Sequence, residues 1–95
     1  MALRFAVGTR DLLVTLAPRP RRAIRDALRL LAADPRHPKL DLKQLRKEGS
    51  VRFYRARVGD YRIVFSPLPK HTSVWRIQHR SEGYGWLERL DPPAA

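Results

Sequence analysis

The segment 52–80, RFYRARVGDYRIVFSPLPKHTSVWRIQHR, decides the fold of this chain. Aromatic and β-branched residues alternate with charged ones along it, which is typical of half-buried strands. The predicted strands are 53–58, 61–66 and 73–79. Gly59-Asp60 predicts a tight hairpin after the first strand, and the proline-containing stretch 67–72 predicts a longer loop after the second.

The two faces of these strands differ sharply in chemistry. Neighbouring side chains of a strand point to opposite faces, so every second residue shares a face. One set is apolar and predicts a core: Tyr54, Ala56, Val58, Tyr61, Ile63, Phe65, Trp75 and Ile77. The other set is basic: Arg55, Arg57, Arg62, Arg76 and, at the strand end, Arg80.

An arginine-lined face needs a source of negative charge. The segment contains one acidic residue, Asp60 in the hairpin, so we expect the neutralising groups to come from outside the fold. A phosphate backbone suits the planar fork of arginine. The alternative is a solvated face that only keeps the protein soluble.

Composition limits the class of protein. A chain of 95 residues is expected to form a single domain, 1–95, with one core. Its formal net charge of +11 favours nucleic acid, the ribosome, an anionic membrane surface or an acidic protein as partner. The chain has no cysteine, which excludes disulfides and thiolate metal sites. The early apolar run 5–7 is too short for a signal or membrane segment, so we expect a cytoplasmic protein.

Two helices are predicted before the strands. A short strand over 3–7 ends at Gly8, and Thr9 is the expected N-cap of a first helix. Pro20 suits the first turn of a second helix that ends near Asp34. Its predicted core stripe is Ile24, Ala27, Leu28 and Leu31. Its arginines, Arg21, Arg22, Arg25 and Arg29, predict a solvated face or a rim that meets a larger partner.

The remaining segments give weaker patterns. The period of 39–47 is ambiguous, so we expect an irregular approach with at most a short turn of helix or strand. Trp86, Leu87 and Leu90 predict a weak C-terminal helical turn, and 91–95 a frayed tail. The fold class is therefore α+β: a two-helix hairpin packed on one face of a small twisted, mainly antiparallel sheet, with the arginine face left open.

The sequence contains no pattern typical of a metal site or of a serine nucleophile. His37, His71 and His79 lack ligand-like spacing, and no metal or other cofactor is expected. RNA cleavage remains possible, because RNA supplies its own nucleophile, the 2′-OH, and the protein need only align it, stabilise the oxyanions and move two protons. Tyr84 is a candidate base, since nearby positive charge favours the phenolate. His79 is either catalytic or a packing residue, and Trp86 either stacks on a base or covers the core.

These residues also resemble a known family over nearly the whole chain. The run 54–65, YRARVGDYRIVF, followed by 77–80, IQHR, and then by Tyr84, resembles the RelE branch of the RelE/ParE toxin superfamily. The resemblance implies a toxin that enters the ribosomal A site and cleaves mRNA, leaving a 2′,3′-cyclic phosphate. It also implies silencing by an antitoxin, which we expect to be acidic and RelB-like.

The resemblance assigns roles to residues of this sequence. It implies that Arg55 and Arg57 stabilise the phosphate and the transition state, with Arg62 as a further clamp. It implies that Arg80 donates a proton to, or stabilises charge at, the leaving 5′-oxygen. It implies that Tyr84 is both base and stacking residue. The catalytic set is thus Arg62, Arg80 and Tyr84, and the predicted RNA and phosphate contacts are Arg55, Arg57, Arg76 and Lys47.

Two other functions stay open at this stage. ParE-type relatives share the fold but poison DNA gyrase, and they tend to lack the arginine and tyrosine set. The presence of both Arg80 and Tyr84 favours RelE. A non-catalytic nucleic-acid-binding module would tolerate loss of Tyr84 while depending on total charge.

Overall fold

The computed structural model describes residues 2–90. Its elements are β1 (Leu3–Phe5), α1 (Asp11–Thr15), α2 (Pro18–Ala33), β2 (Asp41–Glu48), β3 (Val51–Val58), β4 (Tyr61–Pro67), β5 (Thr72–His79) and α3 (Gly85–Glu88). The strands of this described part form one sheet in the order β1-β5-β4-β3-β2. β1 pairs with β5 in parallel and the other neighbours are antiparallel, which confirms the α+β prediction. The predicted tail, 91–95, lies outside the described residues.

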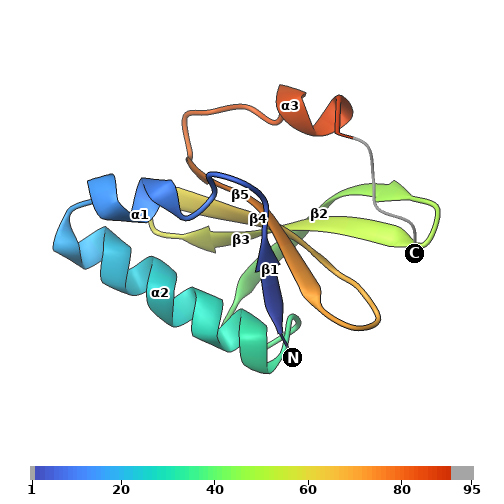
Figure 1. Cartoon of the computed structure of the whole chain (residues 1–95), viewed down its shortest axis with the longest axis horizontal. Coiled ribbons are helices and arrows are strands. Elements are labelled where there is room, and N and C mark those ends of the chain that lie inside the picture. Colours follow the sequence, from blue (N-terminus) through green and yellow to red (C-terminus); the bar gives the residue numbers. More distant parts are fainter. Residues whose placement is uncertain (1, 91–95) are drawn as a thin grey trace.

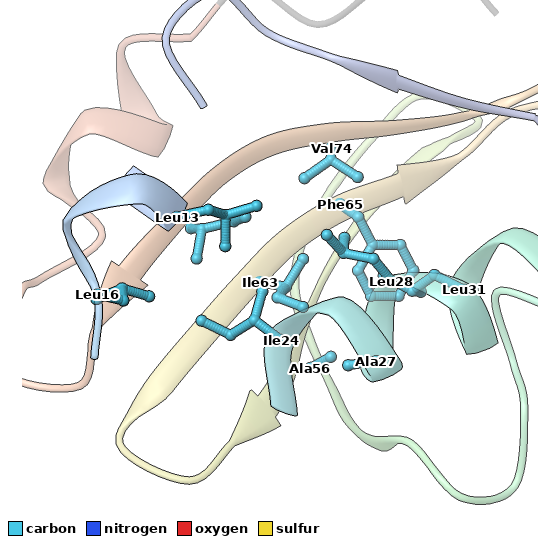
Figure 2. Close-up of a cluster of buried hydrophobic side chains, with 11 residues drawn as sticks. Leu13, Leu16, Ile24, Ala27, Leu28, Leu31, Ala56, Ile63, Phe65 and Val74 are labelled. Atoms are coloured by element: carbon cyan, nitrogen blue, oxygen red, sulfur yellow. The ribbon is translucent and has the colours of Figure 1, made fainter. Parts of the chain in front are cut away.

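Helices lie on both sides of the sheet. α2 lies along one side of it and α3 lies on the opposite side (Figure 1). The main core fills the space between the sheet and the helices α1 and α2, as Figure 2 shows for Ile24, Ile63 and Phe65. No helix within residues 2–90 is long and apolar enough to cross a membrane.

α2 forms because its apolar residues recur on one side. Ile24 and Leu31 are fully buried, and Ala27 and Leu28 lie beside them in the core. The spacing of these four residues is the predicted stripe, and the stripe prediction is confirmed. The helix begins at Pro18, so Pro20 lies in its first turn as predicted, where no backbone N–H donor is needed from either proline.

The connection from β1 to α1 differs from its prediction. β1 ends at Phe5, so Val7 is not part of the strand and its side chain is fully exposed. Gly8 has a φ of +80°, which turns the chain out of the strand direction. Thr9 is not the N-cap of α1; that position is Arg10, and the Thr9 hydroxyl instead donates to the carbonyl of Trp75.

The segment predicted to be irregular is a full strand, β2. It pairs antiparallel with β3, and the chain turns between them through Gly49, whose φ is +60°. The ambiguous period has a physical cause: Leu42 packs in the main core, whereas Leu45 packs on the opposite face of the sheet. A register shift between Gln44 and Arg46 accompanies this change.

The predicted hairpin at Gly59-Asp60 is confirmed. Val58 and Tyr61 are paired across it, so the loop has two residues. Gly59 has a φ of +59°, and within residues 2–90 no residue other than glycine has a positive φ. Glycine at the first central position, with a positive φ there alone, is typical of a type II′ turn.

Trp75 lies on the opposite face from the one predicted. A register shift between β4 and β5 pairs Phe65 with Val74 and Val64 with Arg76, which leaves Trp75 as the extra residue of a bulge. Val74 therefore occupies the core position, fully buried. The indole of Trp75 packs instead against Phe53, with ring centroids 5.9 Å apart.

The arginine face is not fully open, because α3 covers part of it. A second hydrophobic cluster forms there around the buried residues Val51, Phe53 and Leu87. The partly buried members are Leu45, Leu68, Trp75, Tyr84, Trp86 and Leu90. The prediction of a weak C-terminal helix is confirmed, and its apolar residues dock where an open face was expected.

Replacing Ile24 by Ala tests the main core. The side chain is fully buried, so we expect the Ile24→Ala variant to lose about 2–5 kcal/mol of unfolding free energy, from lost burial and the cavity left behind. Val14→Ala in α1 is the control, because Val14 is 77% exposed and its truncation should change stability by less than about 0.5 kcal/mol. Equal urea midpoints for the two variants would contradict this assignment of the core.

Candidate nucleic-acid interface

The predicted arginines of β3, β4 and β5 lie on one face of the sheet in two adjacent rows, which together we call the arginine row. Arg57 is paired with Arg62, and Arg62 is paired with Gln78 of β5. Arg55 lies in the next row on the same face, where Val64 separates it from Arg76. The sheet therefore brings together four of the seven predicted site residues, Arg55, Arg57, Arg62 and Arg76.

Carboxylates from neighbouring elements pair with most of these arginines. Asp41 lies between two of them, 2.8 Å from Nε of Arg57 and 3.5 Å from an Nη of Arg55. The expectation that the groups neutralising this face come from outside the fold is wrong for Arg55 and Arg57, because Asp41 pairs with both. Asp41 lies outside the segment 52–80. It is the first residue of β2, and the pairing of β2 with β3 places it opposite Arg57.

Two arginines of β5 and its C-terminal end also pair with carboxylates. Arg80 follows β5 and lies 3.5 Å from Asp60, while its backbone N–H donates to the Asp60 carbonyl. Arg76 lies 3.6 Å from Glu82, and its guanidinium covers the ring of Trp86. Each of these ion pairs is at least partly exposed, so each contributes only about 0–1 kcal/mol and can yield to a stronger anion.

Arg62 differs from its neighbours. Its guanidinium donates to the backbone carbonyls of Gly59 and Tyr61, at 3.0 and 2.9 Å, and pairs with no carboxylate of the described residues. Within residues 2–90 the charge of Arg62 is therefore not compensated, although the hairpin holds the side chain in place. A fixed and uncompensated guanidinium in the middle of a basic row is a good position for a phosphate.

Tyr84 reaches the same face from the C-terminal segment. It precedes the first turn of α3 and belongs to the second cluster, where it lines a small hollow. The other lining residues are Leu45, Arg46, Leu87 and Glu88. Tyr84 thus lies towards β2, whereas Arg80 is held at the Gly59-Asp60 hairpin.

Gln78 fixes the segment that carries Tyr84, and this role was not predicted from the sequence. Its side chain is 1% exposed. The amide nitrogen donates to the carbonyls of Glu82 and Gly83, at 2.9 and 3.2 Å, and the amide oxygen accepts from Nε1 of Trp86 at 2.8 Å. An uncharged residue on an otherwise basic strand face was the available signal.

The structure also places the four aromatic or histidine residues for which packing was one of the roles considered. Tyr54 stacks on Phe65 and Tyr61 packs in the main core, as predicted. His79 contacts Tyr61 edge to face, and its Nδ1 lies 2.8 Å from the Ser81 hydroxyl. Trp86 is a member of the second cluster.

Lys47 does not join the arginine row. It is paired with Arg52 at the β2–β3 hairpin end, beyond the rows that contain Arg55 and Arg57. Its side chain is exposed. Within residues 2–90, no three His, Asp or Glu side chains gather in a way that could hold a metal ion.

Gln78→Ala tests the link between β5 and α3. The variant leaves the Trp86 N–H and two carbonyls without their partner, so we expect unfolding free energy to fall by about 1–3 kcal/mol. Gln44→Ala is the control, because Gln44 is an exposed strand glutamine whose truncation should cost less than about 0.5 kcal/mol. Urea unfolding followed by tryptophan fluorescence measures both, and equal losses would refute the role of Gln78.

Asp41→Asn tests whether the carboxylate holds the place of a phosphate. Binding an RNA oligonucleotide must break the two ion pairs of Asp41, each worth about 0.2–1 kcal/mol, so the variant should bind about twofold to thirtyfold more tightly. Asp34→Asn removes the same charge next to α2 and serves as control. An equal gain in both variants, measured by fluorescence anisotropy, would show that only net charge matters.

Comparisons with known proteins agree with this architecture. The family model of the ParE toxin of type II toxin–antitoxin systems, parDE, matches residues 9–84. No curated protein matches the sequence. Among solved structures, the RelE–RelB complex of Pyrococcus horikoshii OT3 is similar with a TM-score of 0.73 and 24% identity, over 86% of this chain and 97% of that chain.

Two further complexes show the same fold. The RelB–RelE antitoxin–toxin complex of Methanococcus jannaschii gives a TM-score of 0.68 at 24% identity, over 86% of this chain and 95% of that chain. The toxin–antitoxin complex RelBE2 of Mycobacterium tuberculosis gives 0.62 at 28% identity, over 83% and 96%. The predicted superfamily is confirmed: the chain belongs to the ParE toxin family of type II toxin–antitoxin systems, within the RelE/ParE superfamily, and has a RelE-like fold.

Proposed function

We propose that this toxin is a ribosome-dependent endoribonuclease that cleaves mRNA in the ribosomal A site without a metal ion. The observation that supports the proposal best is the arginine row, with Arg62 fixed by backbone carbonyls and uncompensated by any described carboxylate. Tyr84 on the same face of the sheet adds a group that can accept a proton. The solved relatives named above are RelE toxins, which also favours this activity.

In the proposed reaction the 2′-OH of one nucleotide attacks the adjacent phosphorus and the bond to the 5′-oxygen breaks. Tyr84 takes the proton of the 2′-OH, and Arg80 donates a proton to, or stabilises, the departing 5′-oxygen. Arg62 and Arg57 bind the non-bridging oxygens, where negative charge increases in the transition state. The products are a 2′,3′-cyclic phosphate and a free 5′-OH.

The remaining basic residues bind the RNA on either side of the cleaved bond. Arg55 and Arg76 lie beside the central row and contact neighbouring phosphates. Lys47 is paired with Arg52, which lies on the other face of β3 from Arg55 and Arg57, so it faces away from the proposed RNA path. Phosphate replaces Asp41 and Glu82 as the partner of these arginines. Electrostatic binding of this kind is the main contribution that fixed guanidinium groups can make, because arginine gives up a proton with difficulty.

The ribosome is part of the proposed active geometry. Arg80 is held at the hairpin and Tyr84 in the second cluster, so the mRNA must be bent across the face to meet both. A-site mRNA that is already positioned meets this requirement at a lower entropic cost than free RNA. We therefore expect free RNA to be cut poorly.

The proposed regulatory partner is an acidic, RelB-like antitoxin. The three solved relatives are complexes of RelE with RelB, and the net charge of +11 favours an acidic partner here. Both partners would act in the cytoplasm, where mRNA is translated.

Inhibition of DNA gyrase is the second candidate. It is favoured by the matched family model, which describes the ParE toxin of parDE. A gyrase inhibitor needs no proton transfer to RNA, so the phenol of Tyr84 distinguishes the two candidates.

Tyr84→Phe tests the endonuclease proposal by primer extension on mRNA in a translating system. Loss of the base should lower cleavage by about a hundredfold or more, because general base catalysis contributes about 10²–10⁴-fold. Tyr54→Phe is the matched control and should leave cleavage unchanged, since Tyr54 stacks in the main core on the other face. Arg62→Ala should behave like Tyr84→Phe.

Circular dichroism of each variant separates loss of the fold from loss of chemistry. Full cleavage by folded Tyr84→Phe would exclude Tyr84 as the base. Absence of ribosome-dependent cuts by the wild-type protein, together with inhibition of purified gyrase, would establish the second candidate.

A further inference from the structure

The outer face of α2 is a second basic surface. Arg22, Arg25 and Arg29 follow one another at spacings of three and four residues, so they lie in one stripe along the helix. All three side chains are exposed, whereas the opposite face of the helix is buried in the main core. We call these three residues the α2 arginine stripe.

The stripe is separate from the arginine row on the sheet. α2 packs on one side of the sheet, and the row lies on the side that α3 partly covers (Figure 1). The two basic surfaces therefore face away from each other. RNA bound to the row would not contact the stripe.

Little of the positive charge on α2 is neutralised within the fold. Arg29 pairs with Asp26 at 3.2 Å, and both side chains are more than half exposed, at 79% and 60%. Arg22 and Arg25 pair with no acidic side chain of residues 2–90. Arg21, beside the stripe, is held by its bond to the carbonyl of Leu16, which fixes the start of the helix.

We propose that the α2 arginine stripe binds the phosphate backbone of double-helical RNA. Sites for single-stranded RNA combine basic groups with aromatic side chains on which unpaired bases stack. The sheet face has such side chains, Tyr84 and Trp86, but the sequence of α2, PRPRRAIRDALRLLAA, contains no aromatic residue. A rigid line of guanidinium groups without stacking partners suits a duplex, which is recognised mainly by shape and phosphate contacts.

An acidic protein is a poorer match for this surface. A protein helix docked on a helix needs large apolar anchors as well as charge. The exposed large apolar residues of residues 2–90 are Val7 and Val14, and neither belongs to α2. The outward positions of α2 offer charge and small side chains, which fits phosphate better than a protein groove.

Duplex binding by the α2 arginine stripe does not depend on cleavage. Opposite sides of the molecule would then bind two forms of RNA, a single strand on the sheet face and a duplex on α2. Within a ribosome, the duplex would be supplied by ribosomal RNA and the single strand by mRNA. Duplex binding can therefore be measured without catalytic activity.

The test compares two double variants that each lose two positive charges. Arg22→Gln/Arg25→Gln removes part of the stripe, and Lys39→Gln/Lys70→Gln removes two exposed charges from loops outside α2. Fluorescence anisotropy measures affinity for an RNA duplex of about 20 base pairs, longer than the roughly 16 that a double-strand-binding domain spans. An unstructured single strand of equal length is measured beside it.

The stripe variant should bind the duplex about tenfold more weakly, and the slope of log affinity against log salt should fall by about two, since each phosphate contact contributes about 0.9. Its affinity for the single strand should match that of the loop variant. The single substitutions Arg22→Gln and Arg25→Gln should each change the slope by about one. Glutamine is a good helix former, so the helix is expected to persist, and circular dichroism checks it.

Two results would overturn the inference. Equal weakening of duplex binding by the stripe and loop variants would mean that only total charge acts. Unchanged duplex binding by the stripe variant, with weaker binding to polyglutamate, would assign the surface to an acidic protein. If instead mRNA cleavage is absent while the stripe variant loses duplex binding as expected, the proposed function fails and this inference stands.

Discussion

The alternation of side chains along β3, β4 and β5 is the constraint on which the rest of the structure depends. Burying Ala56, Ile63 and Phe65 beneath α2 forces Arg55, Arg57 and Arg62 onto the other side. The core and the basic row are thus two results of the same strand geometry. A change of register by one residue would place arginine in the core and phenylalanine in the solvent, so packing energy also holds the proposed site in place.

Much of the fold was predictable because local patterns and long-range packing agree. The helical stripe of α2 and the Gly59-Asp60 hairpin each follow from a spacing or a turn preference that the sheet then uses. The face of Trp75 was not predictable, because a bulge adds one residue and reverses the alternation at that point. β2 was missed for a related reason: Leu42 and Leu45 serve opposite faces, so no single period describes them.

The site was predictable in its arginines but not in its supporting residues. Strand parity follows directly from spacing in the sequence, and it places four arginines on one face: Arg55, Arg57, Arg62 and Arg76. Asp41 and Glu82 pair with this face from other elements, and their approach depends on how β2 and the segment after β5 are placed. Gln78 was missed because a buried amide is recognised by its partners, and these lie four to eight residues further along the chain.

The two hydrophobic clusters have unequal sizes, and this has a consequence for how the molecule opens. Eleven buried residues form the main core, whereas three form the cluster beneath α3. α3 can separate from the sheet while the larger cluster stays intact, since local opening costs less than global unfolding where few apolar contacts are buried. Hydrogen exchange at the amides of α3 would then be faster than at β4. The part of the chain that carries Tyr84 would behave as the first unit to melt, on a body that remains folded.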